Sequence, residues 1–423
     1  MRTKATAGAA RVAGAPPPTK SAIIQDGREC AVAPPSDGHE LRSDITLVTQ
    51  ASVDRLWMLP QICSRWGGAM IVATLQPSDG GHVAWPAMAA NDTSGCALQR
   101  LELARSKAPS APGDAAAYPI NWLRNVGISC VATSHFFIVD VDFWPTAELL
   151  PLLRGRLTAW TADAPPTALV VPNFQRSGHG CRNAVDAGAC RVELAAGNIT
   201  MPNTLAELHA CLRAKNCGIF DGEYNPQGQA STDVRAWKLL TPGETRRVPC
   251  ITSDRYEPFI ALRKAEETPP FDERFSGYGK NKVQYAVHLR HAGYRFEVLG
   301  GGFVVHFPHM RSDAKHHWLH SSAHAKVDQL FSKFGREMSR RYADTSPRTP
   351  MCTGRHAAAA NNGSSSGGSS GGGSSGGGAS GGGASGGGSG RSTSSAPGEH
   401  DQPHVNSTAK RRGRGRRRVA NVS

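Results

Sequence analysis

The sequence lacks the segments that would hold a chain in a membrane or export it. Nowhere in its 423 residues does an apolar run reach roughly 18, the length that a membrane-spanning helix needs. The charged start, apolar core and small-residue cleavage site of a secretory signal are missing as well. Acidic residues are absent before Asp26, while Arg, Lys and Ala are frequent there. Such a start is typical of an organelle transit peptide and equally of an incomplete N-terminus, and both interpretations stay open.

Closely spaced cysteine pairs are also missing, although the sequence contains 10 cysteines. Structural zinc sites usually draw their ligands from Cys-x-x-Cys pairs, so their absence argues against such a site. Four cysteines cluster with two histidines in the middle of the chain: His179, Cys181, Cys190, His209, Cys211 and Cys217. We expect disulfides within this cluster if the chain resides in an oxidising compartment. Glycosylation acceptor sequences at Asn91 and Asn198 fit the same compartment.

The composition is uneven along the chain and indicates three parts. From residue 363 to 390 the sequence is almost entirely Gly and Ser, which bury too little apolar surface to offset the entropy of ordering. The start of the chain is rich in Ala, Pro and Gly. We therefore predict a disordered segment over 1–43, a folded domain over 44–346, and a disordered linker and tail over 347–423.

A basic run at Lys410–Arg418 distorts the net charge of +14. The stretch from Arg391 to the end holds eight basic and two acidic residues, so the rest of the chain is only mildly basic. A run of this kind could bind nucleic acid or an acidic membrane surface. We favour a solvated tail, because the run has no interleaved aromatic residues and nothing in the core supports nucleic-acid binding.

The middle of the chain alternates between short apolar runs and helical patterns. In chain order we expect a strand over Asp44–Gln50, a helix from Val53 to about Ser64 capped by Ser52, a strand over Ala69–Thr74, a helix beginning at Tyr118–Val126 and a strand over Phe136–Val139. Strand–helix–strand alternation predicts an α/β fold with a mostly parallel sheet, and ligands bind at the carboxyl ends of such strands.

Two carboxylates stand at the carboxyl end of the last of these strands. Asp140 and Asp142 follow the run Phe136–Val139 and precede the break at Trp144-Pro145. Side chains two residues apart point to the same face of a strand. Carboxylates placed in this way hold the divalent ion of nucleotide-sugar transferases, where the ion neutralises the leaving diphosphate. The pair therefore predicts a metal site, with a solvated turn as the plain alternative.

Ordered motifs around this pair resemble glycosyltransferase family 49, which includes the glucuronyltransferase domain of the LARGE proteins and a β-1,4-glucuronyltransferase. The resemblance covers roughly residues 44–345. Its motifs are Thr46-Leu47-Val48-Thr49-Gln50 with Asp54-Arg55-Leu56, Pro119-x-Asn121-x-Leu123-Arg124-Asn125, Asp140-x-Asp142-Phe143, Ala168-Leu169-Val170-Val171-Pro172, Tyr256-Glu257-Pro258-Phe259, Phe271-Asp272-Glu273-Arg274-Phe275, Gly277-Tyr278-Gly279-Lys280-Asn281-Lys282 and His306-Phe307-Pro308-His309.

The resemblance implies a GT-A fold, a Rossmann-like α/β domain that binds a UDP-sugar through a divalent ion, usually Mn²⁺. Transfer to a glycan or glycoprotein acceptor inverts the anomeric centre, so a general base is expected near the attacking hydroxyl. Glucuronic acid is the sugar that the family leads us to expect, while xylose, galactose and N-acetylglucosamine stay open. The family also implies the Golgi lumen and a membrane anchor, and no anchor is visible in this chain.

Site residues follow from the same motifs. The metal ligands are expected to be Asp142, His306 and Asp140, the last contacting either the ion or the donor's ribose; His309 is the weaker alternative to His306. The positions expected to bind the donor are Thr49, Asn121, Arg124, Asn125 and Asp140. A cation at Arg124 would suit the carboxylate of glucuronic acid.

The general base is assigned to Asp272, with Glu273 as a second choice. In related inverting galactosyltransferases a carboxylate follows the Gly-aromatic-Gly turn, but here Lys280-Asn281-Lys282 follow Gly277-Tyr278-Gly279. The resemblance also has departures elsewhere, because Gln175 stands where the family shows a glutamate and Gln229 where it shows a histidine. These changes leave two functions open, an active transferase and a catalytically silent homologue that binds glycan or protein.

Overall fold

The structure of this chain is a computed structural model that describes residues 20–24, 41–78, 80–88, 95–109, 118–160, 163–177, 187–309 and 323–353. The chain divides into two units, residues 1–366 and 367–423, and every described residue belongs to the first. The predicted disordered segments 1–43 and 347–423 fall largely outside the described residues.

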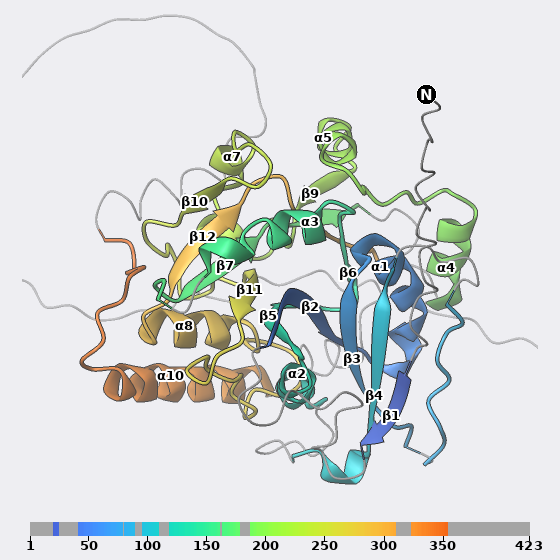
Figure 1. Ribbon diagram of the computed structural model, residues 1–423, viewed down its shortest axis with the longest axis horizontal. Coiled ribbons are helices and arrows are strands. Elements are labelled where there is room, and N and C mark those ends of the chain that lie inside the picture. Colours follow the sequence, from blue (N-terminus) through green and yellow to red (C-terminus); the bar gives the residue numbers. More distant parts are fainter. Residues whose placement is uncertain are drawn as a thin grey trace, which may run out of the picture. The chain divides into compact units, whose positions relative to one another are not determined.

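Thirteen strands and a set of helices form the described structure (Figure 1). The strands are β1 (Lys20–Ile24), β2 (Arg42–Gln50), β3 (Ala69–Leu75), β4 (Ala97–Leu103), β5 (Thr133–Ile138), β6 (Phe143–Pro145), β7 (Thr167–Val171), β8 (Asn173–Arg176), β9 (Cys217–Ile219), β10 (Thr245–Arg247), β11 (Phe259–Arg263), β12 (Arg295–Leu299) and β13 (Val304–His306). The α-helices are α1 (Leu59–Trp66), α2 (Ile120–Ser129), α3 (Leu149–Arg154), α4 (Ala187–Ala195), α5 (Leu205–Arg213), α6 (Gln227–Ala230), α7 (Val234–Trp237), α8 (Val283–His291) and α10 (Ala323–Arg341). The 3₁₀ helices are η1 (Val53–Met58), η2 (Arg105–Lys107) and η3 (Leu157–Ala159).

The central sheet has nine strands in the order β1-β4-β3-β2-β5-β11-β7-β12-β10. Its first five strands are parallel neighbours. Strand β11 runs antiparallel to both β5 and β7, β12 is again parallel to β7, and β10 is antiparallel to β12. The predicted α/β class with a mostly parallel sheet is therefore confirmed.

Helices cover the sheet because its central strands are apolar along their length. Residues 44–50 of β2 are all buried, as expected of a parallel strand that is covered on both faces. Helices α2 and α3 both pack on β2. At Gly127, α2 approaches the sheet so closely that a Cβ atom would lie 2.7 Å from Val48 Cγ1. Figure 1 shows α8 and α10 side by side at another part of the unit, where they contact each other.

A small second sheet has the strand order β6-β13-β8-β9. Its strand β6 is the next strand after β5 in the chain. Its register places His306 of β13 opposite Phe143 of β6 and Gln175 of β8. This sheet therefore brings a histidine from the end of the domain next to the two aspartates that follow β5.

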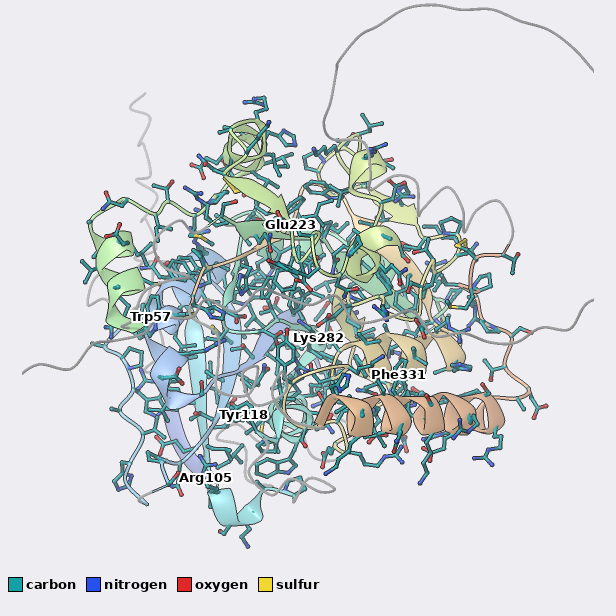
Figure 2. All side chains as sticks on the ribbon, turned by 180° about the vertical axis from the view of Figure 1, so that it is seen from behind. Trp57, Arg105, Tyr118, Glu223, Lys282 and Phe331 are labelled. Atoms are coloured by element: carbon teal, nitrogen blue, oxygen red, sulfur yellow. A yellow bond between two sulfur atoms is a disulfide. The ribbon has the colours of Figure 1, made fainter. Side chains whose placement is uncertain are left out.

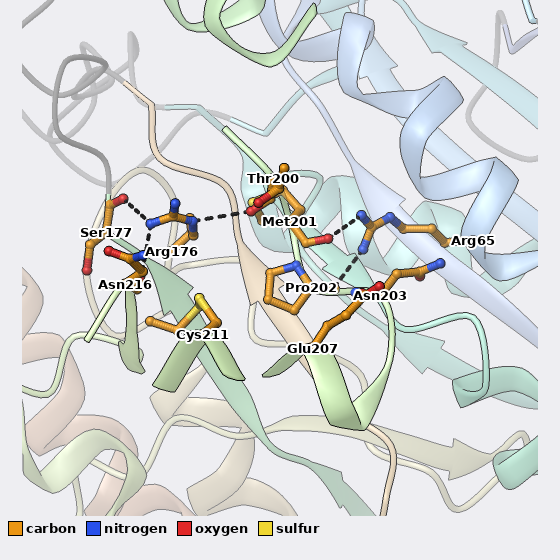
Figure 3. The surroundings of a disulfide bond; sticks show 11 residues. Arg65, Arg176, Ser177, Thr200, Met201, Pro202, Asn203, Glu207, Cys211 and Asn216 are labelled. Atoms are coloured by element: carbon orange, nitrogen blue, oxygen red, sulfur yellow. Dashed lines mark hydrogen bonds between the residues drawn. A yellow bond between two sulfur atoms is a disulfide. The ribbon is translucent and has the colours of Figure 1, made fainter. Parts of the chain in front are cut away.

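Disulfides tie the loops to this framework. Cys211 and Cys217 link α5 to β9, which meets the expectation of a disulfide within the central cysteine cluster. In that cluster Cys190 is a free, buried thiol, and Cys181 lies outside the described residues. Around the disulfide, Arg176 donates hydrogen bonds to the carbonyls of Thr200 and Asn216, as Figure 3 shows. Two further disulfides join Cys63 to Cys96 and Cys250 to Cys352, and Cys130 is disulfide-bonded as well.

The described structure continues past residue 346, where the predicted domain ends. The amide of Phe296 donates to Thr349 Oγ1 at 3.0 Å, and Arg348 Nη1 donates to the carbonyl of Gly293 at 2.8 Å. Ile251 forms an isolated bridge with Met351, beside the disulfide between Cys250 and Cys352. Residues 348–352 therefore belong to the packing of this unit. None of the described helices is both long and apolar enough to cross a membrane.

Candidate metal and donor site

The two aspartates lie in the turn that follows β5, between the two sheets. The carbonyl of Asp140 accepts a hydrogen bond from the amide of Phe143 at 2.9 Å, which closes the turn. The carbonyl of Asp142 accepts from the amide of Phe307 at 2.8 Å, which fixes the turn against the segment after β13. The side chains of Asp140 and Asp142 meet different partners.

Asp142 belongs to a cluster with two histidines. Its Oδ2 atom lies 2.9 Å from His309 Nε2 and 3.7 Å from His306 Nε2, and the two Nε2 atoms are 3.1 Å apart. In this cluster, each of the three residues offers a ligand atom, and these atoms lie within 4.8 Å of one another. The structure thus brings together the predicted ligands Asp142 and His306, and it adds His309, which was the weaker alternative.

The electrostatics of this cluster favour a cation. Burial alone would raise the pKa of Asp142, but its close contacts with His306 and His309 and the charge of Arg55 hold the pKa well below its usual value. Burial lowers the pKa of His306 to about 4, although Asp142 acts in the opposite direction. At neutral pH the cluster therefore holds an ionised carboxylate and a neutral His306 imidazole, the forms in which these groups bind metal ions.

Packing holds the histidines in place from several elements. The ring of His306 lies 4.9 Å from that of Phe143 and 5.1 Å from that of Phe220. Phe307, the residue after His306, stacks on Trp144 and meets Trp57 of η1 edge to face. Trp57 is labelled in Figure 2. Because these aromatic contacts are buried or partly buried, they hold the cluster in position before any ligand arrives.

Asp140 lies outside the histidine cluster and is surrounded by three donors. Its Oδ1 accepts from Gln50 Nε2 at 2.9 Å and from Arg124 Nη2 at 2.6 Å, while its Oδ2 accepts from Lys282 Nζ at 2.7 Å. Burial would raise the pKa of Asp140, but the charges of Lys282 and Arg124 outweigh this effect and lower it. Lys282, labelled in Figure 2, also lies 3.3 Å from the carboxylate of Glu257. These contacts do not include the metal cluster, so the role of Asp140 as a direct ligand stays a prediction.

Arg124 is fully buried and contacts protein groups on several sides. Its Nη1 donates to the side-chain oxygens of Asn121 and Asn281, both at 2.9 Å, and its Nη2 reaches Asp140. Its guanidinium also lies 5.1 Å from the ring of Phe271. These contacts make Arg124 a support for Asp140, and they do not favour the predicted contact with a donor carboxylate. Thr49, another predicted donor residue, is also fully buried.

The remaining predicted residues form a separate group beside α2. Asn125 Nδ2 donates to Glu273 Oε1 at 2.8 Å and to the carbonyl of Phe271 at 2.9 Å. The carboxylate of Asp272 accepts hydrogen bonds from Nε and Nη2 of Arg274, at 2.5–3.0 Å. Arg274 thus occupies both side-chain oxygens of Asp272. The assignment of the base to Asp272 or Glu273 therefore stays a prediction that their contacts do not favour.

A family model described as glycosyl-transferase for dystroglycan matches residues 78–343. The chain belongs to glycosyltransferase family 49. The mouse protein "Xylosyl- and glucuronyltransferase LARGE2" is 30% identical over 311 residues, which are 73% of this chain and 40% of the mouse protein. The human protein "Xylosyl- and glucuronyltransferase LARGE1" is 28% identical over 71% of this chain and 36% of its own length. The chain thus spans well under half of the relatives it matches.

Solved structures show a weaker likeness. TarS 1–349 from S. aureus, in complex with UDP-GlcNAc, aligns with a TM-score of 0.38 and 10% identity over 71% of each chain. Glucosyl-3-phosphoglycerate synthase from Mycobacterium tuberculosis, in complex with Mn²⁺, UDP-glucose and phosphoglyceric acid, aligns with a TM-score of 0.32 and 16% identity over 69% of this chain and 80% of its own. Membership of family 49, the α/β sheet and the carboxylates after β5 agree with the predicted GT-A fold.

Several residues of this family 49 site were not assigned a role from the sequence. Arg55, Gln50 and Lys282 contact Asp142 or Asp140, and each lies within a motif of the family resemblance. The two departures from the family have structural partners here. Gln175 Oε1 accepts from the amide of Asp221 at 3.0 Å, and Gln229 Nε2 donates to the carbonyl of Glu257 at 2.9 Å.

Proposed function

We propose that this chain is a metal-dependent, inverting glycosyltransferase that moves a sugar from a UDP-sugar to a glycan acceptor. The observation that carries the proposal is the cluster of Asp142, His306 and His309 at the carboxyl end of β5. The carboxyl ends of parallel strands are where ligands bind in sheets of this type.

The residues of this cluster fit a divalent ion such as Mn²⁺. Asp142 Oδ1 and His306 Nδ1 are buried and have no hydrogen-bond partner within the described part of the chain. A buried carboxylate oxygen without a partner is costly unless a ligand satisfies it. One carboxylate and two imidazoles are suitable ligands for Mn²⁺. When bound, the ion would neutralise charge that develops on the leaving diphosphate.

The chain's own residues would prepare the site for this chemistry. Asp142, His306 and His309 would hold the ion, and their aromatic neighbours would keep them in place. Asp140, held by Arg124, Lys282 and Gln50, would fix the turn that presents Asp142. Asp272 remains the proposed base, with Glu273 second.

The sugar and the acceptor are proposals that rest on the family. Relatives are named xylosyl- and glucuronyltransferases, so glucuronic acid is the first donor to test and xylose the next. The disulfides favour an oxidising compartment, in agreement with the Golgi lumen that the family implies. We also retain the proposed folded domain over 44–346, extended before residue 44 by β1 and the start of β2 and after residue 346 by the contacts of residues 348–352.

The test is UDP release from a panel of UDP-sugars, with and without Mn²⁺. We expect Mn²⁺-dependent release with one donor and a loss of about 100-fold or more in Asp142→Asn, because even the outer partners of metal ligands contribute about 10- to 100-fold. Asp163→Asn is the matched control, since Asp163 is exposed before β7. Donor binding without release would leave the acceptor to be found. Neither binding nor release would instead favour a silent homologue.

A further inference from the structure

Arg55 forms an ion pair with the carboxylate of Asp142, which is proposed to bind the metal. Its Nη1 donates to Asp142 Oδ2 at 2.7 Å, and its Nη2 lies 3.3 Å from His309 Nδ1. The side chain of Arg55 is 18% exposed and that of Asp142 is 11% exposed, so the pair is partly shielded from water. Asp142 Oδ2 is therefore shared between a guanidinium and an imidazole in this structure.

The position of Arg55 creates a conflict of charge once an ion binds. Without a metal, Arg55 balances the single negative charge of Asp142. A divalent ion on the same carboxylate would place two cations within a few ångströms of each other, and such charges repel strongly where water is largely excluded. The cluster would then carry two positive charges in excess, which matches the two negative charges of the diphosphate in a nucleotide sugar.

The location of Arg55 allows it to serve a diphosphate. η1 directly follows β2, and so Arg55 stands at the carboxyl edge of the parallel sheet, where ligands of such sheets bind. A guanidinium presents paired donors that match phosphate oxygens. In the described residues the side chain of Arg55 forms its hydrogen bonds with Asp142 and His309, both members of the metal cluster. A movement of this side chain away from the cluster would therefore break no side-chain hydrogen bond outside it.

We propose that Arg55 is a displaceable counter-ion, which neutralises Asp142 in the metal-free site and pairs with the donor's diphosphate once the metal is bound. This inference rests on the proposed function. It implies that Arg55 weakens the binding of the metal alone and strengthens the binding of the nucleotide, so the two ligands help each other to bind. Arg55 is in this sense a residue that couples metal and donor.

The experiment measures two affinities of the full chain by titration calorimetry: Mn²⁺ alone, and UDP at saturating Mn²⁺. In Arg55→Gln we expect Mn²⁺ alone to bind about tenfold more tightly and UDP about tenfold more weakly, within the range usual for coupled sites. Arg55→Lys keeps the charge but loses the paired donors, so it should leave Mn²⁺ affinity near that of the wild type and weaken UDP. It also serves as the second variant if Arg55→Gln does not fold.

Arg154→Gln is the matched control. Like Arg55, Arg154 forms an ion pair with an aspartate. Its partner, Asp44, lies near the start of β2, whereas Arg55 follows the end of β2. This variant should change neither affinity. Arg55→Gln with both affinities unchanged, or with both weakened, would overturn the inference while leaving the proposed function intact. A wild-type chain that binds neither Mn²⁺ nor UDP would overturn both.

Discussion

Asp140 and Asp142 are separated by a single residue, yet they have unlike surroundings. Both side-chain oxygens of Asp140 accept hydrogen bonds, and the donors are Gln50, Arg124 and Lys282. Without these donors the carboxylate of Asp140 would lose its charge-neutralising partners. Asp142 instead faces Arg55 and two histidines, and its Oδ1 has no partner in the described residues. An Asp-x-Asp motif can thus combine one aspartate that shapes the turn with one that is available to a ligand.

Buried histidines give this chain a pH-dependent stability. Burial lowers the pKa of His288, on α8, to about 4 from a usual value of 6.5. The unfolded chain therefore binds this proton more readily than the folded chain, so the free energy of unfolding should fall as the pH drops from 6.5 towards 4. For one such histidine the loss is on the order of 3 kcal/mol, since one pKa unit corresponds to about 1.4 kcal/mol.

Urea denaturation at several pH values between 7 and 4 measures this effect. His288→Gln should flatten the dependence, because the glutamine can keep a hydrogen bond to Tyr342 without gaining a proton. Asp44 has a pKa below 3.8, so its contribution is lost at lower pH than this window. A slope that is equal in the variant and the wild type would contradict the assignment.

Part of the metal cluster could be predicted from the sequence. Asp142 and His306 were named from motifs, because carboxylates and imidazoles have recognisable chemistry, and the structure brings these two residues together. The pairing of Arg55 with Asp142 joins residues 87 apart in the chain, and such contacts depend on tertiary packing that no local pattern records. For the same reason the environment of Arg124 was not predicted. Arg124 was expected to contact the donor, but it is buried and pairs with Asp140.

At the scale of elements, the packing of α2 on β2 depends on Gly127. A Cβ atom there would lie 2.7 Å from Val48 Cγ1, a side chain too short to move aside. Gly127→Ala should therefore destabilise the fold by about 1 kcal/mol, because overpacking costs about 1–3 kcal/mol and outweighs the gain of about 1 kcal/mol in helix propensity. Thermal unfolding under one set of conditions measures the change.

Gly335 of α10 provides the control of opposite sign. It also lies within a helix, but a Cβ atom there would meet nothing within 4 Å. Gly335→Ala should raise the free energy of unfolding by about 1 kcal/mol through helix propensity alone. If both variants shift stability in the same direction, the close approach at Gly127 does not govern the packing of α2.

The strands with strong apolar runs were predicted close to their observed bounds. The strand expected over Asp44–Gln50 is β2, and the one expected over Ala69–Thr74 is β3. The helix expected from Val53 begins there as η1 and continues as α1. Pro60 lies in the first turn of α1, a position at which proline is tolerated. The antiparallel insertion of β11 between β5 and β7 was not predicted, because strand order depends on contacts between distant segments.

For the molecule as a whole, residues 348–352 extend the folded unit beyond the predicted boundary at 346. A cut after Ser346 would follow the predicted domain boundary but remove Arg348, Thr349 and Cys352, which contact the unit through two hydrogen bonds and a disulfide. A cut after Ser366 would keep them and remove only the second unit of the chain. We expect the shorter form to lose about 3 kcal/mol or more of unfolding free energy, since a native disulfide alone contributes about 2–4 kcal/mol.

Cys352→Ser in the longer form separates the disulfide from the other contacts. This variant should lose only part of the stability, because Thr349 Oγ1 would still accept from the amide of Phe296. The form cut after Ser346 loses both this hydrogen bond and the disulfide. Urea denaturation of the four proteins, including the full chain, measures the order. Equal stability of the two truncated forms would place the boundary at 346 after all, and the contacts of residues 348–352 would then be incidental to the fold. If instead the form cut after Ser366 matches the full chain, residues 367–423 contribute nothing to the stability of the unit that carries Asp142, His306 and His309.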